Sequence, residues 1–362
     1  METPFDLAEE LSKQSGLLEI PGNLLMKGGP EDYIGAVICL RGTLYFKNAH
    51  TPEVREALCQ CFDAFKRLAE PNLTWLWREE PPEGSPLTPY AEARSLREML
   101  SHMNENYPLS FYYTSGEQPN DASDWYFDVF GQAAWEAKIG YDTSAVEFSV
   151  PLLYHEQHSL DFMRLFQYCA RLLDAEHGHA GHAFNLSVTN LGENEPTEAF
   201  MAERMPGLDA GTAGLLANRP EFKQNKIKTV SWLTLLNQAR LEAAGGLKSL
   251  QDQLPDSHFA FYAAGSGVVI QSGAYPYIAG DAEGAKPAPY VLLNHLLKSI
   301  RCETVGDLHG GSRHGELRLT GWAADQWLKR LDVDEQEIPA WRTRLLEQEP
   351  RLDSSNSLPE RL

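Results

Sequence analysis

Hydrophobic and polar positions alternate over several short stretches of this chain, and in others they recur at helical spacing. Residues 34–46 (IGAVICLRGTLYF) are apolar, β-branched and aromatic, which predicts a buried strand or a bent pair of strands. Residues 51–70 follow with a Thr cap, a proline at the first helical position and one apolar face. A strand followed by an amphipathic helix is therefore expected near the start of the chain.

The same two patterns continue along the sequence. Strand-like runs lie at 73–77 and then, after a helix predicted at about 91–105, at LSFYYTS, DWYFDVFG and SAVEFSVPLLY, where close spacing favours antiparallel pairing. Residues 158–176 have the strongest helical pattern, with Ser159 as the expected cap. Further on, KTVSWLTLLN predicts a strand, and HFAFYAA and GVVIQSG predict a hairpin that turns at residues 265–267.

This mixture predicts an α+β fold in which antiparallel sheets are flanked by helices. We expect an N-terminal segment over 1–29, one α+β domain over 30–320, and a helical C-terminal extension over 321–362 with a frayed end. Within the domain, two intimately packed lobes are expected at about 30–190 and 191–320. No sequence repeat is recognisable.

Composition narrows the functional classes. The 362 residues carry a formal net charge of −20, which opposes the neutralisation of phosphates and therefore excludes nucleic acid as the expected partner. The five cysteines lack metal or disulfide spacing and are expected to be reduced thiols. Because neither a signal peptide nor an 18-residue apolar run is present, we expect a cytoplasmic protein with no membrane partner.

The densest group of possible ligands is the segment DAEHGHAGHAF, which holds His177, His179 and His182. Neutral imidazoles bind zinc or nickel, and this group would support a divalent-metal-dependent hydrolase. The interleaved glycines instead favour a turn after the preceding helix, with no metal and no cofactor. HEQH, with His155 and His158, has i and i+3 spacing in place of the i and i+4 of zinc proteases, and His155 is expected to lie outside the helix that Ser159 begins.

Nucleophile and phosphate-loop motifs are lacking. AAGSGV around Ser266 does not have the glycine spacing of a nucleophile elbow, and GDLHGGSRHG lacks the ending of a phosphate loop. No catalytic residue is therefore predicted.

The segments that resemble a known family begin at residues 205–237 (MPGLDAGTAGLLANRPEFKQNKIKTVSWLTLLN) and continue through the predicted hairpin to PAPYVLLNHLLKSIR. These segments, with AVEFSVPLLY and HGHAGHAFNLS upstream, resemble the type VI secretion immunity protein family over roughly residues 30–305. The resemblance implies a structural turn at the histidine segment. We interpret Pro206, Gly207 and Asp209 in the same way, as a turn between the halves of the chain.

Members of that family accompany nuclease effectors, including the virus-type replication-repair nuclease class. The resemblance therefore implies a non-catalytic immunity protein that binds a cognate type VI secretion toxin and occludes its active site. The metal-dependent hydrolase and an adaptor for a different partner are the alternatives. A homo-oligomer stays possible.

Two segments are candidates for partner contact because they combine acids with aromatic residues. The first, GEQPNDASDWYFD, offers Asp121, Asp124 and Trp125; the second, SGAYPYIAGDAEG, offers Tyr275, Tyr277 and Asp281. In the first segment, Trp125 as a core residue and the acids as turn residues form the structural alternative.

Overall fold

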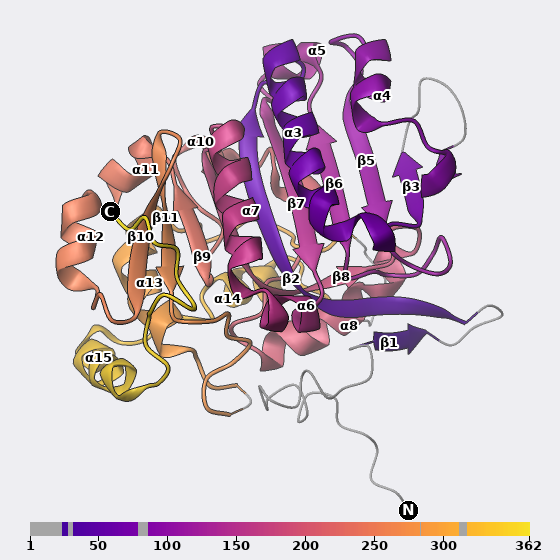
Figure 1. Cartoon of the computed structure of the whole chain (residues 1–362). Coiled ribbons are helices and arrows are strands. Elements are labelled where there is room, and N and C mark those ends of the chain that lie inside the picture. Colours follow the sequence, from indigo (N-terminus) through magenta and orange to yellow (C-terminus); the bar gives the residue numbers. More distant parts are fainter. Residues whose placement is uncertain (1–23, 28–31, 79–85, 283, 311–316) are drawn as a thin grey trace, which may run out of the picture.

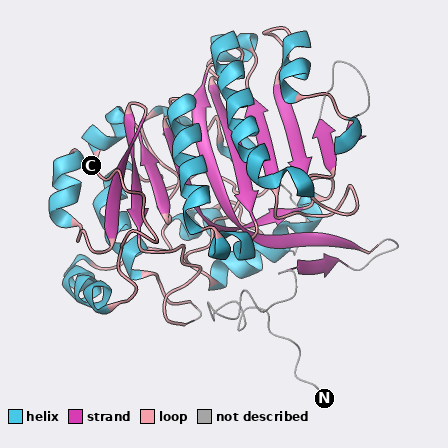
Figure 2. Cartoon of the chain, in the orientation of Figure 1, coloured by secondary structure: helices cyan, strands magenta, loops and turns pink. Residues whose placement is uncertain are grey.

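One antiparallel sheet of eleven strands forms the centre of the described part of the chain (Figure 1, Figure 2). The structure is a computed structural model that describes residues 24–27, 32–78, 86–282, 284–310 and 317–362. The strands are β1 (Leu24–Lys27), β2 (Tyr33–Lys47), β3 (Trp75–Arg78), β4 (Leu87–Pro89), β5 (Leu109–Thr114), β6 (Tyr126–Gly131), β7 (Thr143–Val150), β8 (His177–Leu186), β9 (Leu233–Leu236), β10 (Phe259–Ala264) and β11 (Gly267–Ser272).

The strand order is β10-β11-β9-β8-β2-β7-β6-β5-β3-β4, and β1 pairs with β2 beside this path. Strand β2 is central, because Leu40 pairs with Val150 of β7 on one side and with His182 of β8 on the other. All fifteen positions of β2 are buried or half-buried, which suits a strand that is covered on both faces. The expected α+β fold with an antiparallel sheet is confirmed.

Helices cover both faces of the sheet. In the view of Figure 1, α3, α4 and α7 lie in front of the strands, and α8 lies behind and below them. The helices are α3 (Pro52–Ala69), α4 (Leu96–His102), α5 (Ala134–Lys138), α6 (Leu152–Gln157), α7 (Ser159–Leu172), α8 (Leu191–Arg204), α9 (Ala213–Leu216), α10 (Pro220–Lys223), α11 (Gln238–Ala243), α12 (Leu247–Gln253), α13 (Ala288–Leu297), α14 (Trp322–Leu328) and α15 (Ile338–Glu347).

Local signals in the sequence account for several of these elements. Helix α3 has the predicted cap, since the Thr51 side chain accepts a hydrogen bond from the Val54 amide and Pro52 is the first helical residue. The predicted hairpin is β10–β11, with Gly265 at φ 59° in the turn. The cap predicted for α7 is wrong: Ser159 is its first residue, and its hydroxyl donates to the Ser355 carbonyl oxygen 3.0 Å away.

The sheet continues across the expected boundary between lobes at residue 190, because β8 pairs with β9. The division into lobes stays a prediction.

Both helices predicted in the C-terminal extension are present as α14 and α15. Beyond them the chain returns to the edge strand β10, where the Leu362 amide donates to the Phe261 carbonyl oxygen at 2.8 Å. Fraying of this end concerns motion and stays a prediction, and the expected segment 1–29 lies outside the described residues apart from 24–27.

The five cysteines are buried and unpaired. None of the helices that the structure describes is long and apolar enough to cross a membrane.

Candidate functional site

The histidine segment is a buried strand, and the predicted turn at residues 177–181 is wrong. Residues 177–186 form β8, all ten of them buried. The glycines that suggested a turn are needed for close packing: a Cβ on Gly178 would lie 2.5 Å from the Thr43 carbonyl oxygen. A Cβ on Gly181 would lie 2.2 Å from the Ser231 hydroxyl oxygen. The chain turns earlier, at Asp174 with φ 42°.

Strand geometry separates the three histidines. Side chains alternate between the faces of a strand, so His177 and His179 lie on one face of the sheet and His182 lies on the other. His177 stacks on Tyr45 with ring centroids 4.4 Å apart. Among the described residues, no group of three His, Cys, Asp or Glu side chains could hold a metal ion. The three histidines therefore do not form the metal site that a hydrolase of this type would require.

On the face of His179, a buried ionic cluster forms around Asp209. The Asp209 carboxylate accepts from Lys228 Nζ at 2.6 Å and from Arg41 at 3.0 Å, and it lies 3.1 Å from His179 Nε2. Arg41 also lies 3.6 Å from Glu147, a second buried carboxylate. Two cations thus face two anions where water is excluded, which is the condition under which buried charges are tolerated.

The pKa shifts follow from these contacts. Burial alone would raise the pKa of Asp209, but Lys228, His179 and Arg41 hold it well below its usual range. Burial lowers the pKa of Lys228 despite the attraction of Asp209. Burial also lowers the pKa of His179, so this ring is expected to be neutral at pH 7.

Asp209 is therefore more than a turn residue. Residues 206 and 207 do form the predicted turn, but the Asp209 side chain lies in the ionic cluster and not in a cap. The Asp209 amide donates to the His182 carbonyl oxygen at 2.8 Å, which attaches this segment to β8. Sequence reasoning missed the cluster because Arg41 and Asp209 are 168 positions apart.

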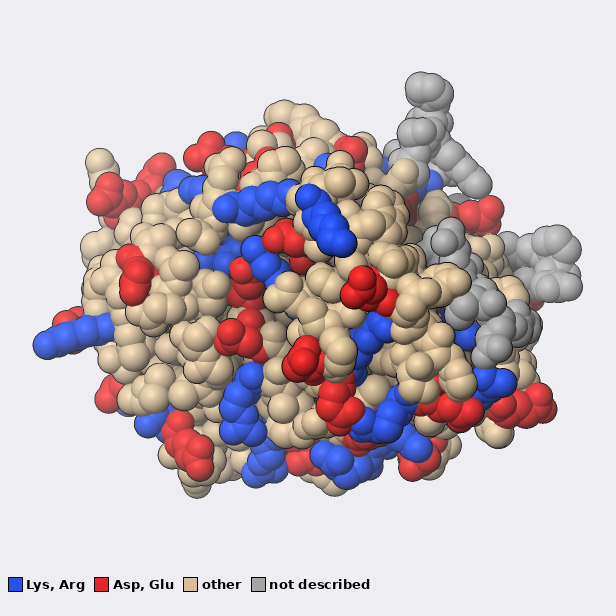
Figure 3. All heavy atoms as spheres, turned by 90° about the horizontal axis from the view of Figure 1, so that it is seen from above, with Lys and Arg blue, Asp and Glu red and all other residues tan. Residues whose placement is uncertain are grey.

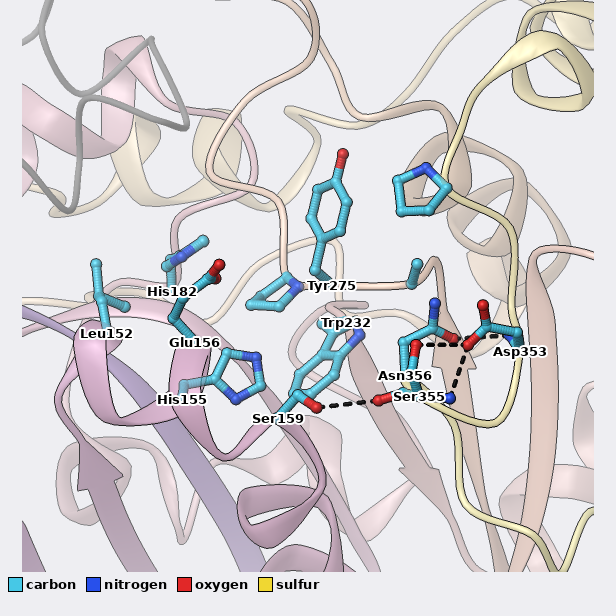
Figure 4. A pocket seen from close by; sticks show the side chains of 13 residues that line it. Leu152, His155, Glu156, Ser159, His182, Trp232, Tyr275, Asp353, Ser355 and Asn356 are labelled. Atoms are coloured by element: carbon cyan, nitrogen blue, oxygen red, sulfur yellow. Dashed lines mark hydrogen bonds between the residues drawn. The ribbon is translucent and has the colours of Figure 1, made fainter.

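On the opposite face of β8, His182 lines a pocket of about 590 Å³ (Figure 4). One wall is formed by His155 and Glu156 of α6, and another by the C-terminal segment 350–356. Trp232 and the loop 274–276 complete the lining. The hydrogen bond from Ser159 to Ser355 joins the helical wall to the C-terminal wall.

The two histidines of this pocket are buried and uncharged at neutral pH. His155 lies outside α7, as expected, but within the separate short helix α6. Burial lowers the pKa of His155 to about 4, and burial together with the neighbouring His155 lowers the pKa of His182 to about 4. Nδ1 of each ring has no hydrogen-bond partner among the described residues.

The first predicted contact segment is mostly internal. Asp121 is buried and accepts from the Ile34 and Gln118 amides, and Trp125 packs edge-on against Phe65 and Tyr154. Asp124 is half-buried, and desolvation raises its pKa. These contacts organise the loop before β6.

The second predicted contact segment reaches the surface. Tyr275 is half-buried in the lining of the pocket, and Asp281 is exposed. Tyr277 is buried and packs on Tyr275 with ring centroids 4.8 Å apart. The structure thus places Tyr275 in the lining of the same pocket as His155 and His182, a juxtaposition that the sequence spacing did not indicate.

Elsewhere, exposed apolar side chains gather at α5 and the turn after it, where Trp135, Ile139 and Tyr141 are each more than half exposed. Sequence analysis missed this group because α5 has only five residues. The net acidity does not form a single-sign field on the face seen from above, where acidic and basic side chains are interspersed (Figure 3).

Comparisons with known proteins agree with this architecture. The family model described as TsiV, type VI immunity for VRR-NUC, matches residues 57–331. The solved structure of Pseudomonas aeruginosa T6SS protein PA0821 is 68% identical to this chain, covers 100% of both chains and has a TM-score of 0.93. A search of curated proteins finds no match.

Proposed function

Because the chain belongs to the TsiV family of type VI immunity proteins for VRR-NUC, we propose that it binds a cognate type VI nuclease effector and occludes its active site. The family match over residues 57–331 is the observation that carries this proposal. Direct binding in the cytoplasm, where the effector would meet nucleic acid, is the proposed mode of protection. The protein is proposed to act as an inhibitor and not as an enzyme.

Charge supports this mode of inhibition. A nuclease needs basic side chains that bind phosphates, and carboxylates that bind a divalent metal. The basic side chains of such a groove would attract an acidic protein. A chain with net charge −20 would be steered toward such a groove, and this steering weakens as salt is added. Close-range specificity must come from local contacts, because acidic and basic side chains are mixed on the face in Figure 3.

Of the predicted contact residues, we propose that Tyr275 and Asp281 touch the effector, because their side chains are accessible. Asp121, Trp125 and Tyr277 are proposed to act indirectly, by holding the loops that present the surface. A homo-oligomer is a separate proposal, which light scattering of the free protein and of its complex would test.

Co-expression with the effector encoded beside this gene tests protection, and DNA competition tests occlusion. Purified chain is added to a catalytically inactive effector already bound to a labelled duplex. Occlusion predicts that the duplex is released as the immunity complex forms. A stable ternary complex would contradict occlusion while leaving binding intact, and failure to protect cells would contradict the function itself.

A further inference from the structure

We propose that the pocket between α6, the loop 274–276 and the C-terminal segment 350–356 receives an arginine side chain of the nuclease effector. This inference rests on the proposed function and assigns a specific contact to it. The volume of about 590 Å³ lies in the range of sites that enclose a whole ligand group. An arginine side chain from a partner surface fits within this volume and leaves room for neighbouring parts of the partner.

Acidic groups at the mouth favour a cation. Glu156 is exposed on α6 and has no ion-pair partner among the described residues. Asp353 lies on the opposite wall, where Oδ1 accepts from the amide and hydroxyl of Ser355 at 2.7 and 2.6 Å. These bonds hold the Asp353 carboxylate at the wall (Figure 4). An anionic ligand would be repelled by both carboxylates, whereas a guanidinium would be attracted by both.

The Tyr275 ring offers a second interaction suited to arginine. The Trp232 indole also lines the pocket, but it is only 1% exposed and its Nε1 donates to the Gly273 carbonyl oxygen at 3.2 Å, so it supports the pocket and leaves stacking to Tyr275. Tyr275 packs on Tyr277, so its half-buried ring is supported from one side and is accessible on part of the other. Guanidinium groups stack on such rings more readily than ammonium groups do, which favours arginine over lysine.

None of the described residues that line the pocket is a lysine or an arginine. His155 and His182 are both more than nine-tenths buried, and each has one ring nitrogen without a hydrogen-bond partner. Since burial lowers both pKa values to about 4, the rings are neutral at pH 7 and keep a lone pair that can accept from a donor. A guanidinium with five N–H donors could bind the carboxylates at the mouth, and these neutral rings would not repel it.

The test measures binding of the full-length chain to the catalytically inactive effector by titration calorimetry. We expect Glu156→Gln and Tyr275→Ala each to weaken binding about 10-fold, and Glu156→Lys about 100-fold. Tyr275→Phe should bind like the unaltered chain, because the ring is retained. Glu53→Gln and Glu53→Lys are matched controls, since Glu53 is an exposed acid in the first turn of α3, at the other end of the sheet from α6 (Figure 1).

The outcomes separate this inference from the function on which it rests. If the unaltered chain binds and the Glu156 and Tyr275 variants bind within twofold of it, the pocket assignment is wrong and the proposed function stands. If Tyr275→Ala weakens binding but Glu156→Lys does not, the pocket takes an apolar side chain and not an arginine. If Glu53→Lys weakens binding as much as Glu156→Lys, long-range charge replaces the pocket as the explanation. If the unaltered chain does not bind, both proposals fail.

Discussion

Replacing Asp209 with asparagine would remove one negative charge from the buried ionic cluster while preserving the shape of the side chain. In the native chain this carboxylate accepts hydrogen bonds from Lys228 and Arg41 at 2.6 and 3.0 Å and lies 3.1 Å from His179. The amide of asparagine can still accept from Lys228, but its NH₂ group would point a donor at donors. The cluster would then hold two cations with Glu147 as the remaining close carboxylate.

The expected effect is large. Removing one member of a buried ion pair destabilises a protein by about 3–5 kcal/mol, because the other member stays buried and uncompensated. The side chains of Asp209, Lys228 and Arg41 are all at most 5% exposed, so water cannot replace the lost partner. We therefore expect Asp209→Asn to lower the free energy of unfolding by about 4 kcal/mol at pH 7. This is a substantial part of the 5–15 kcal/mol that is typical of folded domains.

Urea unfolding followed by circular dichroism measures this change. Asp161→Asn is the control, because Asp161 pairs with Arg164 at 3.0 Å but is one-third exposed, and its loss should change stability by about 0.5 kcal/mol. In Asp209→Asn/Lys228→Met, charge balance is restored, so the double variant should be more stable than Asp209→Asn alone. A loss below about 1 kcal/mol in Asp209→Asn, or no recovery in the double variant, would refute the reasoning.

Three further predictions follow from the same structure. Burial lowers the pKa values of His155 and His182 from 6.5 to about 4, so the unfolded chain takes up protons at a higher pH than the folded chain does. The free energy of unfolding should therefore be full above pH 6.5 and fall by about 1.4 kcal/mol per pH unit per histidine toward pH 4. Urea unfolding at a series of pH values measures this slope, and an unchanged slope in His182→Gln would contradict the prediction. Gly178→Ala should destabilise more than Gly181→Ala, by about 3 against 1 kcal/mol in thermal melts, because its Cβ meets backbone and not a rotatable hydroxyl; the reverse order would count against the packing argument. Untagged protein should contain well below one zinc or nickel ion per chain by elemental analysis, whereas one ion per chain would revive the hydrolase alternative.

The sequence predicted elements whose signals are local. The alternation and caps around β2 and α3 depend on neighbouring residues, so the fold class could be inferred from them. The sequence indicated a turn at β8 because it contains glycines. These glycines are needed because Thr43 and Ser231, which lie far away in the sequence, leave no space for a Cβ. The pocket was missed for the same reason, since His155, His182 and Tyr275 come together only when α6, β8 and the loop after β11 pack. Spacing along the chain carries no information about such contacts.

Strand β8 connects the ionic cluster to the pocket. His179 on one face of β8 lies beside Asp209, and His182 on the other face lines the pocket. The Asp209 amide donates a hydrogen bond to the His182 carbonyl oxygen at 2.8 Å. Movement of the Asp209 segment would therefore displace a pocket wall. Binding to a partner is strongest when the contact surface is already in its bound geometry, because less ordering is needed on association. A buried cluster with several hydrogen bonds on the opposite face of β8 would supply that rigidity directly behind the pocket that we propose to receive the effector's arginine.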